Sequence, residues 1–211
     1  MSDPHFEILP KAQQRLWKEL QQQASILRKL DLYLAGGTAL ALQIGHRQSQ
    51  DFDFFSQQSG IAEPLCDWLQ TFPRGLIRET DAHTVHAELD GVKVSFIGNY
   101  PYPLVGNRIM MGKITVASIA DIGLMKLLAI THRATLRDYL DLAIILRDHV
   151  KLDKLLKMSG EKFGKRFNVM IPLKALVSFH DVDQEMPPLR DRTLARSWQK
   201  ILTQAVKEAA L

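Results

Sequence analysis

The sequence predicts an α+β fold, in which a small core of strands is flanked by an N-terminal helix and a C-terminal helical region. Apolar residues recur at helical spacing near the N-terminus, short segments in the middle alternate with period two, and the last third is helical again. We therefore expect a core with the N-terminal helix over residues 1–118 and a helical region over residues 119–211.

The N-terminal helix is expected over residues 10–30, because its apolar residues from Trp17 to Leu27 recur at helical spacing. Residues 32–35 are apolar and predict a short strand, which a pair of glycines ends.

The stretch GGTALALQIGHRQSQDFDFF, residues 36–55, predicts a helix followed by a strand. Thr38 suits a position near the helix N-cap, and Gly45 suits its C-terminal end. In a strand, Asp51 and Asp53 would share one face with Cα atoms about 6.6 Å apart, while the phenylalanines between them face a core.

The middle of the chain predicts a helix over residues 61–72, then a hairpin whose turn is Asp90-Gly91, then a strand over residues 113–118. After this strand, Ser118 and Asp121 resemble a capping box. The helix after them is expected to end near residue 132.

A second helix is expected over residues 136–149, with Thr135 as its cap, and the chain after residue 172 is expected to be mainly helical.

The net charge of +4 is unevenly distributed. Residues 151–211 hold 12 Lys and Arg against 7 Asp and Glu, whereas residues 1–150 hold 15 against 16. The basic part suits a phosphate-rich partner or a solvated helix face. The single cysteine, Cys66, the lack of a signal-like N-terminus and the lack of a long apolar run predict a cytoplasmic protein with no membrane partner.

Asp51 and Asp53 are the predicted metal ligands. Two carboxylates on one face repel each other unless a cation lies between them, and Mg²⁺ commonly takes one or two carboxylates plus substrate phosphates. Gly36 and Gly37 lack Cβ atoms, so the backbone can approach a phosphate there. The helix that starts near Thr38 directs N–H groups to the same point. The pattern predicts a site for a metal and a phosphorylated ligand.

The same stretch resembles the nucleotidyltransferase motif of the AbiEii/AbiGii toxin family, within the DNA polymerase β-like nucleotidyltransferase superfamily. The segment DIGLMKLLAITHRATLRDYLDLAIIL resembles the later helical motif of this family, and LVSFHDVDQEMPPL is similar to the helical tails of some members. The resemblance covers about residues 30–200 and implies a polymerase β-like core with a small mixed sheet.

The resemblance implies transfer of a nucleoside monophosphate from an NTP to an acceptor hydroxyl, with Mg²⁺ or Mn²⁺ as cofactor. It implies RNA, particularly tRNA, as acceptor, although a protein acceptor stays open. It also implies a toxin-like part of a toxin–antitoxin or phage-defence system, and hence an antitoxin partner. The predicted catalytic residues are Asp51, Asp53, Lys126, Asp138 and Asp141. The predicted nucleotide-binding residues are Gly36, Gly37, Thr38, Arg47, Ser49, Arg133 and Arg137.

The second motif has two structural interpretations. On one continuous helix, Lys126, Arg133, Arg137 and Asp141 would fall in one polar stripe suited to a triphosphate. If the helix breaks near Ala134, only Arg137 and Asp141 stay coupled, at i and i+4. A salt-bridged helix face without a ligand is the other alternative.

Ser95 departs from the superfamily pattern, because a third carboxylate usually occupies its place on a neighbouring strand. Glu88 could replace that acid. Alternatively, two carboxylates could suffice with help from Lys126 and from Asp138 or Asp141, which is the interpretation we favour. The third interpretation is a degenerate module that binds nucleotide or RNA without turnover. Transfer of the γ-phosphate on the same scaffold is a further alternative.

Overall fold

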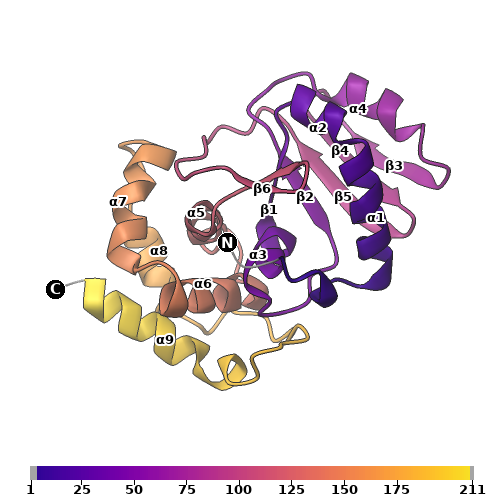
Figure 1. Cartoon of the computed structure of the whole chain (residues 1–211). Helices are drawn as coiled ribbons and strands as arrows, with labels where there is room; N and C mark the ends of the chain where they lie inside the picture. The colour runs from indigo at the N-terminus through magenta and orange to yellow at the C-terminus, as the bar shows by residue number, and fades with distance from the viewer. Residues whose placement is uncertain (1–3, 210–211) are drawn as a thin grey trace. The chain divides into compact units, whose positions relative to one another are not determined.

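A computed structural model describes residues 4–209 (Figure 1). The chain forms two compact units. The first comprises the chain up to Pro103 together with Asn107–Ala117, and the second comprises Leu104–Gly106 together with the chain from Ser118 onward. Every strand among the described residues lies in the first unit, and the second unit is helical.

The first unit is built on a mixed sheet. Its strands are β1 Tyr33–Ala35, β2 Phe52–Phe55, β3 Gly75–Thr80, β4 Thr84–Leu89, β5 Val92–Ile97, β6 Ile109–Met111 and β7 Ile114–Val116. Over the described part of the chain they form one seven-stranded sheet in the order β3-β4-β5-β2-β1-β7-β6. β1 and β7 are parallel, as are β2 and β5, and the other neighbours are antiparallel. β2 is therefore the central strand.

Helices cover one face of this sheet, which is apolar. The helical segments of the unit are η1 Phe6–Ile8, α1 Lys11–Gln22, α2 Ala24–Lys29, α3 Gly36–Ile44 and α4 Ala62–Leu69. Trp17 of α1 stacks on Phe52 with ring centroids 6.0 Å apart, and Trp68 of α4 packs edge-on against Phe96 at 5.9 Å. Alternate residues of β2, β4 and β5 are buried on this side, as expected for strands with one face in a core.

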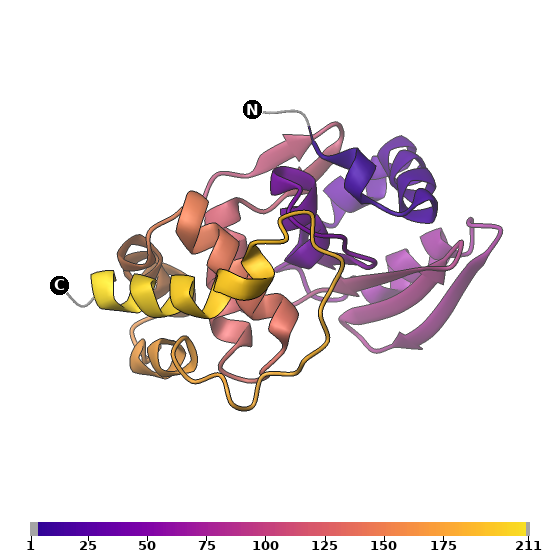
Figure 2. The same ribbon diagram turned by 90° about the horizontal axis from the view of Figure 1, so that it is seen from below.

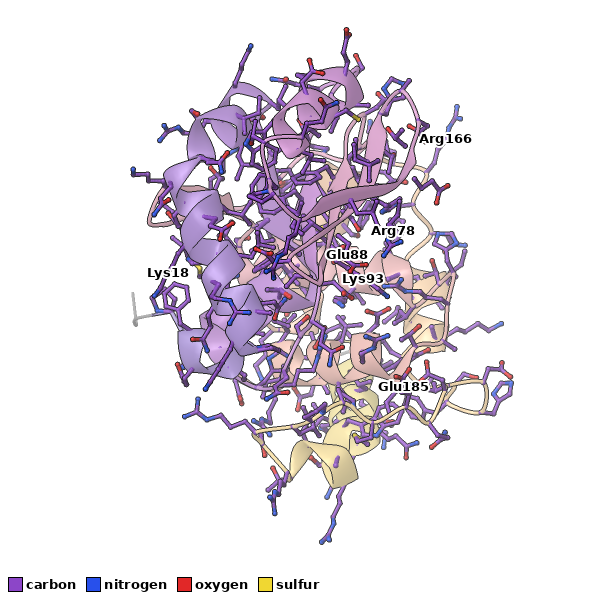
Figure 3. All side chains as sticks on the ribbon, turned by 90° about the vertical axis from the view of Figure 1, so that its right-hand side faces the viewer. Lys18, Arg78, Glu88, Lys93, Arg166 and Glu185 are labelled. Carbon is purple, nitrogen blue, oxygen red and sulfur yellow. The ribbon has the colours of Figure 1, made fainter. Side chains whose placement is uncertain are left out.

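The opposite face of β2, β4 and β5 is polar. It carries Asp53, Ser95 and His86 in one row, with Lys93 and Glu88 beside them, and these five residues are half-buried or exposed. Figure 3 shows Glu88 and Lys93 on adjacent strands of this face. A polar, partly accessible sheet face next to a packed core provides a rigid surface for a functional site.

The second unit packs its helices around aromatic side chains. Its helices are α5 Ile119–Ala129, α6 Leu136–Asp148, α7 Leu152–Phe163, α8 Met170–Ala175 and α9 Leu194–Ala209. α9 lies along α6 in both views of the ribbon (Figures 1 and 2). Tyr139 and Phe179 each meet Trp198 edge-on, with ring centroids 5.7 and 5.0 Å apart. Tyr139 of α6 and Trp198 of α9 therefore join the two helices directly.

The predicted α+β class is confirmed, and the differences concern individual elements. The helix expected over residues 10–30 is broken at Gln23 into α1 and α2. The short strands β3 and β6 were not predicted, and β3 shows no buried alternate face because it lies at the edge of the sheet. Among residues 4–209, no helix combines the length and the apolar character needed to cross a bilayer.

Candidate active site

The helix after the first strand begins at the glycine pair. α3 starts two residues earlier than predicted and has Ala35 as its N-cap, so Thr38 lies inside the first turn. The change is possible because Gly36 has a φ of +71°, a left-handed conformation that turns the chain directly from strand to helix. The Thr38 hydroxyl instead donates a hydrogen bond to the backbone carbonyl of Asp51. This bond ties the first turn of α3 to the start of β2.

Gly36 and Gly37 are in close contact with predicted site residues. A Cβ atom on Gly36 would lie 2.9 Å from Oδ2 of Asp53. A Cβ atom on Gly37 would lie 2.6 Å from a terminal guanidinium nitrogen of Arg47 and 3.1 Å from the Ser49 hydroxyl. A larger residue at either position would push these groups away, and at Gly36 the positive φ of the turn also favours glycine.

Arg47 is only 3% exposed, and its guanidinium also donates a 2.9 Å hydrogen bond to the carbonyl of Gln48. This position suits a side chain that holds the loop before β2 against Gly37. A direct contact of Arg47 with a phosphate, as predicted from the sequence, remains a prediction.

The two aspartates lie at the start of the central strand. Asp51 precedes β2 by one residue and Asp53 is its second residue; both are half-buried, while Phe52 and Phe54 are fully buried. This alternation is the one predicted from DFDFF. It leaves the Asp53 carboxylate on the polar face, next to the N-terminus of α3.

The residues present are compatible with a magnesium ion bound through Asp51 and Asp53. Over residues 4–209 there is no group of three or more His, Cys, Asp or Glu side chains that could enclose a metal. A cation here would therefore need water or phosphate oxygens as further ligands. Mg²⁺ usually keeps such ligands when it serves phosphate chemistry.

Ser95 occupies the position beside Asp53 at which a third carboxylate was expected, because the two residues are Cα partners in the parallel β2–β5 pairing. Glu88 does not take this place. It is the Cα partner of Lys93, and its Oε2 atom lies 2.7 Å from Arg78, which Figure 3 shows at its side. The replacement of the acid by Glu88 therefore receives no support from the geometry.

His86 is a candidate site residue that sequence reasoning missed. It is the Cα partner of Ser95, and its Nδ1 atom lies 3.1 Å from the Ser95 hydroxyl oxygen. From the sequence alone, His86 stands out only through its spacing from His83. Two residues three apart on a strand face opposite sides, which is poor geometry for a zinc pair. The sequence does contain a signal for this contact. In a hairpin with the two-residue turn Asp90-Gly91, counting back from the turn on one strand and forward on the other places residue 86 opposite residue 95.

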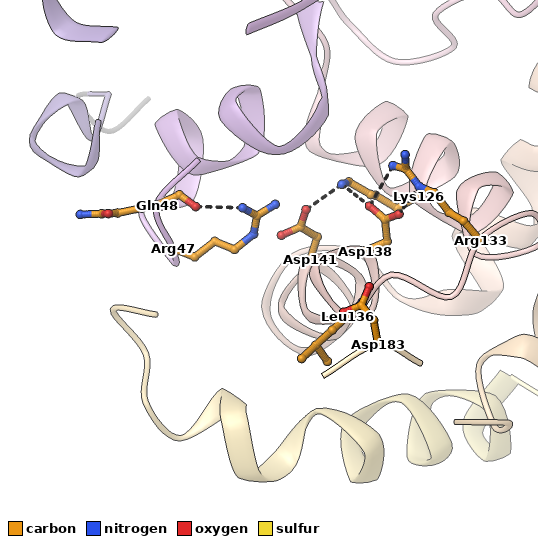
Figure 4. A network of polar contacts seen from close by, with 8 residues as sticks. All are labelled: Arg47, Gln48, Lys126, Arg133, Leu136, Asp138, Asp141 and Asp183. Carbon is orange, nitrogen blue, oxygen red and sulfur yellow. Dashed lines mark hydrogen bonds and ion pairs between the residues drawn. The ribbon is translucent and has the colours of Figure 1, made fainter. Parts of the chain in front are cut away.

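The residues of the second motif form an ion-pair cluster in the second unit (Figure 4). The Nζ atom of Lys126 lies 2.6 Å from Oδ1 of Asp138 and 2.9 Å from Oδ2 of Asp141. The Nε atom of Arg133 lies 2.8 Å from the other oxygen of Asp138. Lys126 and both aspartates are buried, whereas the Arg133 side chain is 63% exposed.

The single polar stripe predicted for a continuous helix does not exist. α5 ends at Ala129 and α6 begins at Leu136, so the packing of two helices brings the cluster together. Arg137 is exposed and lies outside the cluster. Asp141 pairs with Lys126 rather than with Arg137, which corrects the i, i+4 coupling that we expected after a break.

Asp121 is the centre of a second buried network in this unit. Its carboxylate accepts hydrogen bonds from the backbone N–H groups of Val105 and Gly106, both at 2.9 Å, and from the Ser118 hydroxyl at 2.8 Å. Lys162 Nζ of α7 adds a fourth donor at 3.1 Å. Ser118 in turn caps the backbone N–H of Asp121, which confirms the N-cap half of the predicted capping box, and the Asp121 carboxylate returns the contact through the Ser118 hydroxyl. Burial lowers the pKa of Lys162, although the Asp121 carboxylate partly opposes this shift.

Comparison with known proteins gives the family of the chain. The family model described as nucleotidyl transferase AbiEii toxin, type IV TA system, matches residues 25–211. This chain belongs to the AbiEii family of nucleotidyltransferase toxins. Within this AbiEii chain, a 165-residue stretch is also 37% identical to an uncharacterized protein of Aquifex aeolicus strain VF5, which covers 74% of the chain and 77% of the relative.

Two solved structures share the fold of this AbiEii protein. The nucleotidyltransferase toxin MenT4 of Mycobacterium tuberculosis H37Rv matches with a TM-score of 0.59 and 16% identity, over 93% of this chain and 83% of MenT4. JHP933 of Helicobacter pylori matches with a TM-score of 0.52 and 18% identity, over 96% and 95% of the two chains. At this identity they show the fold, and the predicted nucleotidyltransferase fold is confirmed.

Proposed function

We propose that this AbiEii protein transfers a nucleoside monophosphate from an NTP to an acceptor hydroxyl with the help of Mg²⁺ or Mn²⁺. The observation that carries the proposal is the convergence of Gly36, the N-terminus of α3 and Asp53, whose Oδ2 lies 2.9 Å from the position of a Gly36 Cβ. N–H groups at a helix N-terminus bind phosphate, and a carboxylate beside them can bind the cation that phosphate oxygens also ligate. Family membership supports the transferase activity.

In this proposal the first turn of α3 binds the triphosphate, and Asp51 and Asp53 hold the divalent cation. When bound, that cation would offset the negative charge of the phosphate oxygens. The acceptor oxygen attacks the α-phosphorus in line. The bond from the α-phosphorus to the bridging oxygen of the β-phosphate breaks, and pyrophosphate leaves with the electron pair.

Lys126, Arg133 and Arg137 are the proposed phosphate contacts of the second unit, and Asp138 and Asp141 are proposed to fix Lys126. The ion pairs at 2.6 and 2.9 Å support the second part, because they define the orientation of the ammonium group. Arg133 keeps an exposed guanidinium while it binds Asp138, which leaves it accessible to a ligand.

For the acceptor we propose RNA, with tRNA as the first candidate, and for the cell an antitoxin partner. The basic balance of residues 151–211 supports a polyanionic acceptor, because cationic surfaces bind nucleic acid through its phosphates. The toxin–antitoxin class of the family supports the antitoxin.

A module that binds nucleotide or RNA without transfer is the second candidate, and Ser95 favours it. A hydroxyl is a poorer ligand for Mg²⁺ than a carboxylate, so the place beside Asp53 offers a weaker third contact to a metal.

A transfer assay separates the two candidates. Purified protein is incubated with each α-labelled NTP, Mg²⁺ and total RNA, and label on RNA is measured. We expect transfer by the native protein and by Asp67→Ala, which changes an exposed aspartate of α4, but not by Asp53→Ala. Nucleotide binding without transfer by the native protein would support the module. In a parallel incubation with γ-labelled NTP, transfer from that label alone would indicate a phosphotransferase.

A further inference from the structure

A hydrogen-bonded pair lies beside Asp53 on the polar face of the sheet. Asp53, Ser95 and His86 are successive Cα partners across β2, β5 and β4, so their side chains form one row on the same face. Ser95 Oγ and His86 Nδ1 are 3.1 Å apart, in a half-buried contact. In this row the hydroxyl stands between the proposed metal ligand and an imidazole.

We propose that Ser95 and His86 form a proton relay that deprotonates the acceptor hydroxyl in place of the missing third carboxylate. This inference rests on the proposed nucleotidyl transfer. A serine hydroxyl alone is too weak a base, whereas a neutral imidazole accepts a proton near neutral pH. A base in hydrogen-bond contact with a hydroxyl is the arrangement that increases the reactivity of that hydroxyl. Ser95 meets the reacting group, and His86 acts through it as a positioning residue.

The step is balanced in atoms and charge. The acceptor oxygen forms its bond to the α-phosphorus while the bond to the pyrophosphate bridging oxygen breaks. The acceptor proton passes to Ser95 Oγ as the Ser95 proton passes to Nδ1 of His86. Ser95 is thus regenerated as a hydroxyl, and the imidazolium of His86 releases its proton to water after the transfer. No oxidant or further reactant is needed.

The charged groups around His86 are mostly acidic. Each adjacent strand contributes to this set, and Arg78 is already bound to Glu88. The groups near the ring on this face are Glu79 of β3, Asp81 after β3, Glu88 of β4 and Lys93 of β5, and Asp53 of β2 lies one strand further away, beyond Ser95. Positive charge produced on the ring in the step therefore has opposite charges around it.

A first test measures single-turnover transfer against pH for the native protein, His86→Gln and the control His132→Gln, which changes an exposed histidine. General base catalysis contributes about 10²-fold or more, so His86→Gln should lower the rate by about that factor. The dependence of the rate on pH should also differ between His86→Gln and the native protein, while NTP affinity and the control stay at native values. A native rate and pH profile in His86→Gln would overturn the relay.

A second test examines whether Ser95 and His86 act as one unit. Ser95→Ala should slow transfer about as much as His86→Gln, and the double variant should be no slower than either single variant, because a relay fails when either member is lost. Ser95→Thr, which keeps the hydroxyl, should retain most of the rate. Additive losses in the double variant would contradict a shared path for the proton.

A third test needs no turnover. The NMR chemical shifts of the His86 ring protons should change in Ser95→Ala and stay in place in Ser59→Ala, a change at an exposed serine. Unchanged ring-proton shifts in Ser95→Ala would overturn the hydrogen bond on which the relay depends. If Asp53→Ala abolishes transfer but His86→Gln leaves the rate and Ser95→Ala leaves the His86 NMR signals unchanged, the relay is wrong and the proposed function stands. If the native protein transfers no label, both fall.

Discussion

At the scale of single residues, Gly36 is favoured over residues with a Cβ for two reasons, its backbone conformation and its contact with Asp53, which can be separated by experiment. Its left-handed backbone costs about 1–2 kcal/mol for any residue with a Cβ. The 2.9 Å approach to Asp53 adds a steric cost. Gly60 is a matched control, because it has a φ of +65° and nothing within 4 Å of its Cβ position.

We therefore expect Gly36→Ala to lose more stability than Gly60→Ala, and to weaken NTP binding as Asp53 is displaced. Chemical denaturation gives the free energy of unfolding, and equilibrium dialysis with labelled ATP gives the affinity. Equal losses in both properties for the two variants would show that the contact with Asp53 has no effect.

Lys126 gives a second prediction at this scale. Lys126→Met removes the ammonium group that pairs with both Asp138 and Asp141, and breaking a buried ion pair costs about 3–5 kcal/mol. Lys157→Met is the control, since its pair with Asp153 spans 3.6 Å between side chains that are 81% and 53% exposed. That exposed i, i+4 pair contributes about 0.3–0.5 kcal/mol. Urea denaturation of both variants would measure the difference, and similar losses would contradict the structural role of the cluster.

The sequence predicted the grouping of Gly36, Gly37 and Asp53 because one short stretch contains all three. It could not place Lys126 against Asp138, since that contact depends on how two helices pack across a break. The hairpin register would have placed His86 opposite Ser95. His86 was missed because the spacing between histidines, which was used to look for metal sites, says nothing about the residue on the neighbouring strand.

At the scale of elements, the caps of α5 and α6 predict different sensitivities. The Ser118 hydroxyl accepts the N–H of Asp121 at 3.0 Å, whereas the side chain of Thr135 makes no capping hydrogen bond. Ser118→Ala should cost about 1 kcal/mol, a typical value for the removal of an N-cap, and Thr135→Ala only a few tenths. Thermal denaturation of both variants tests this ranking, which a larger loss in Thr135→Ala would reverse.

The contact between α5 and α7 gives a prediction about pH. The folded pKa of Lys162 is lowered by burial from an ordinary value near 10.5. Between these two values the unfolded chain holds a proton that the folded protein has lost, so this group makes the free energy of unfolding rise with pH toward 10.5. Lys162→Met should remove that rise. Urea denaturation across this window would show it as a difference between native and variant that grows with pH, and parallel curves would contradict it.

Local chemistry explains which elements the sequence could predict. The β4–β5 hairpin was predicted because Asp90 and Gly91 favour the positive φ values of 50° and 79° that its turn adopts. β3 was missed because an exposed edge strand has no apolar face to reveal it. The break at Gln23 was missed because the apolar spacing continues across it into α2.

At the scale of the whole molecule, the basic charge of the second unit predicts how RNA binding responds to salt. Changing exposed Lys154, Lys157 and Lys165 to glutamate should weaken tRNA binding and reduce the slope of log affinity against log salt by about 0.7–0.9 for each phosphate that is no longer neutralised. The control changes the exposed lysines of the N-terminal helices, Lys11, Lys18 and Lys29. Filter binding of tRNA to both triple variants at several salt concentrations tests this prediction. Equal slopes in the two variants would show that the RNA does not bind through these lysines of the second unit.

The course of residues 104–106 limits how the protein can be divided into fragments. A recombinant piece that starts at Ser118 would omit Val105 and Gly106, which supply two of the hydrogen bonds to the Asp121 carboxylate. That carboxylate is fully shielded from solvent, so water could not take over the missing donors without an opening of the helices. A single boundary in the sequence therefore does not separate the complete helical unit from the rest of the chain. A fragment that contains only the helical unit would need residues 104–106 added back, for instance through a short linker fused before α5.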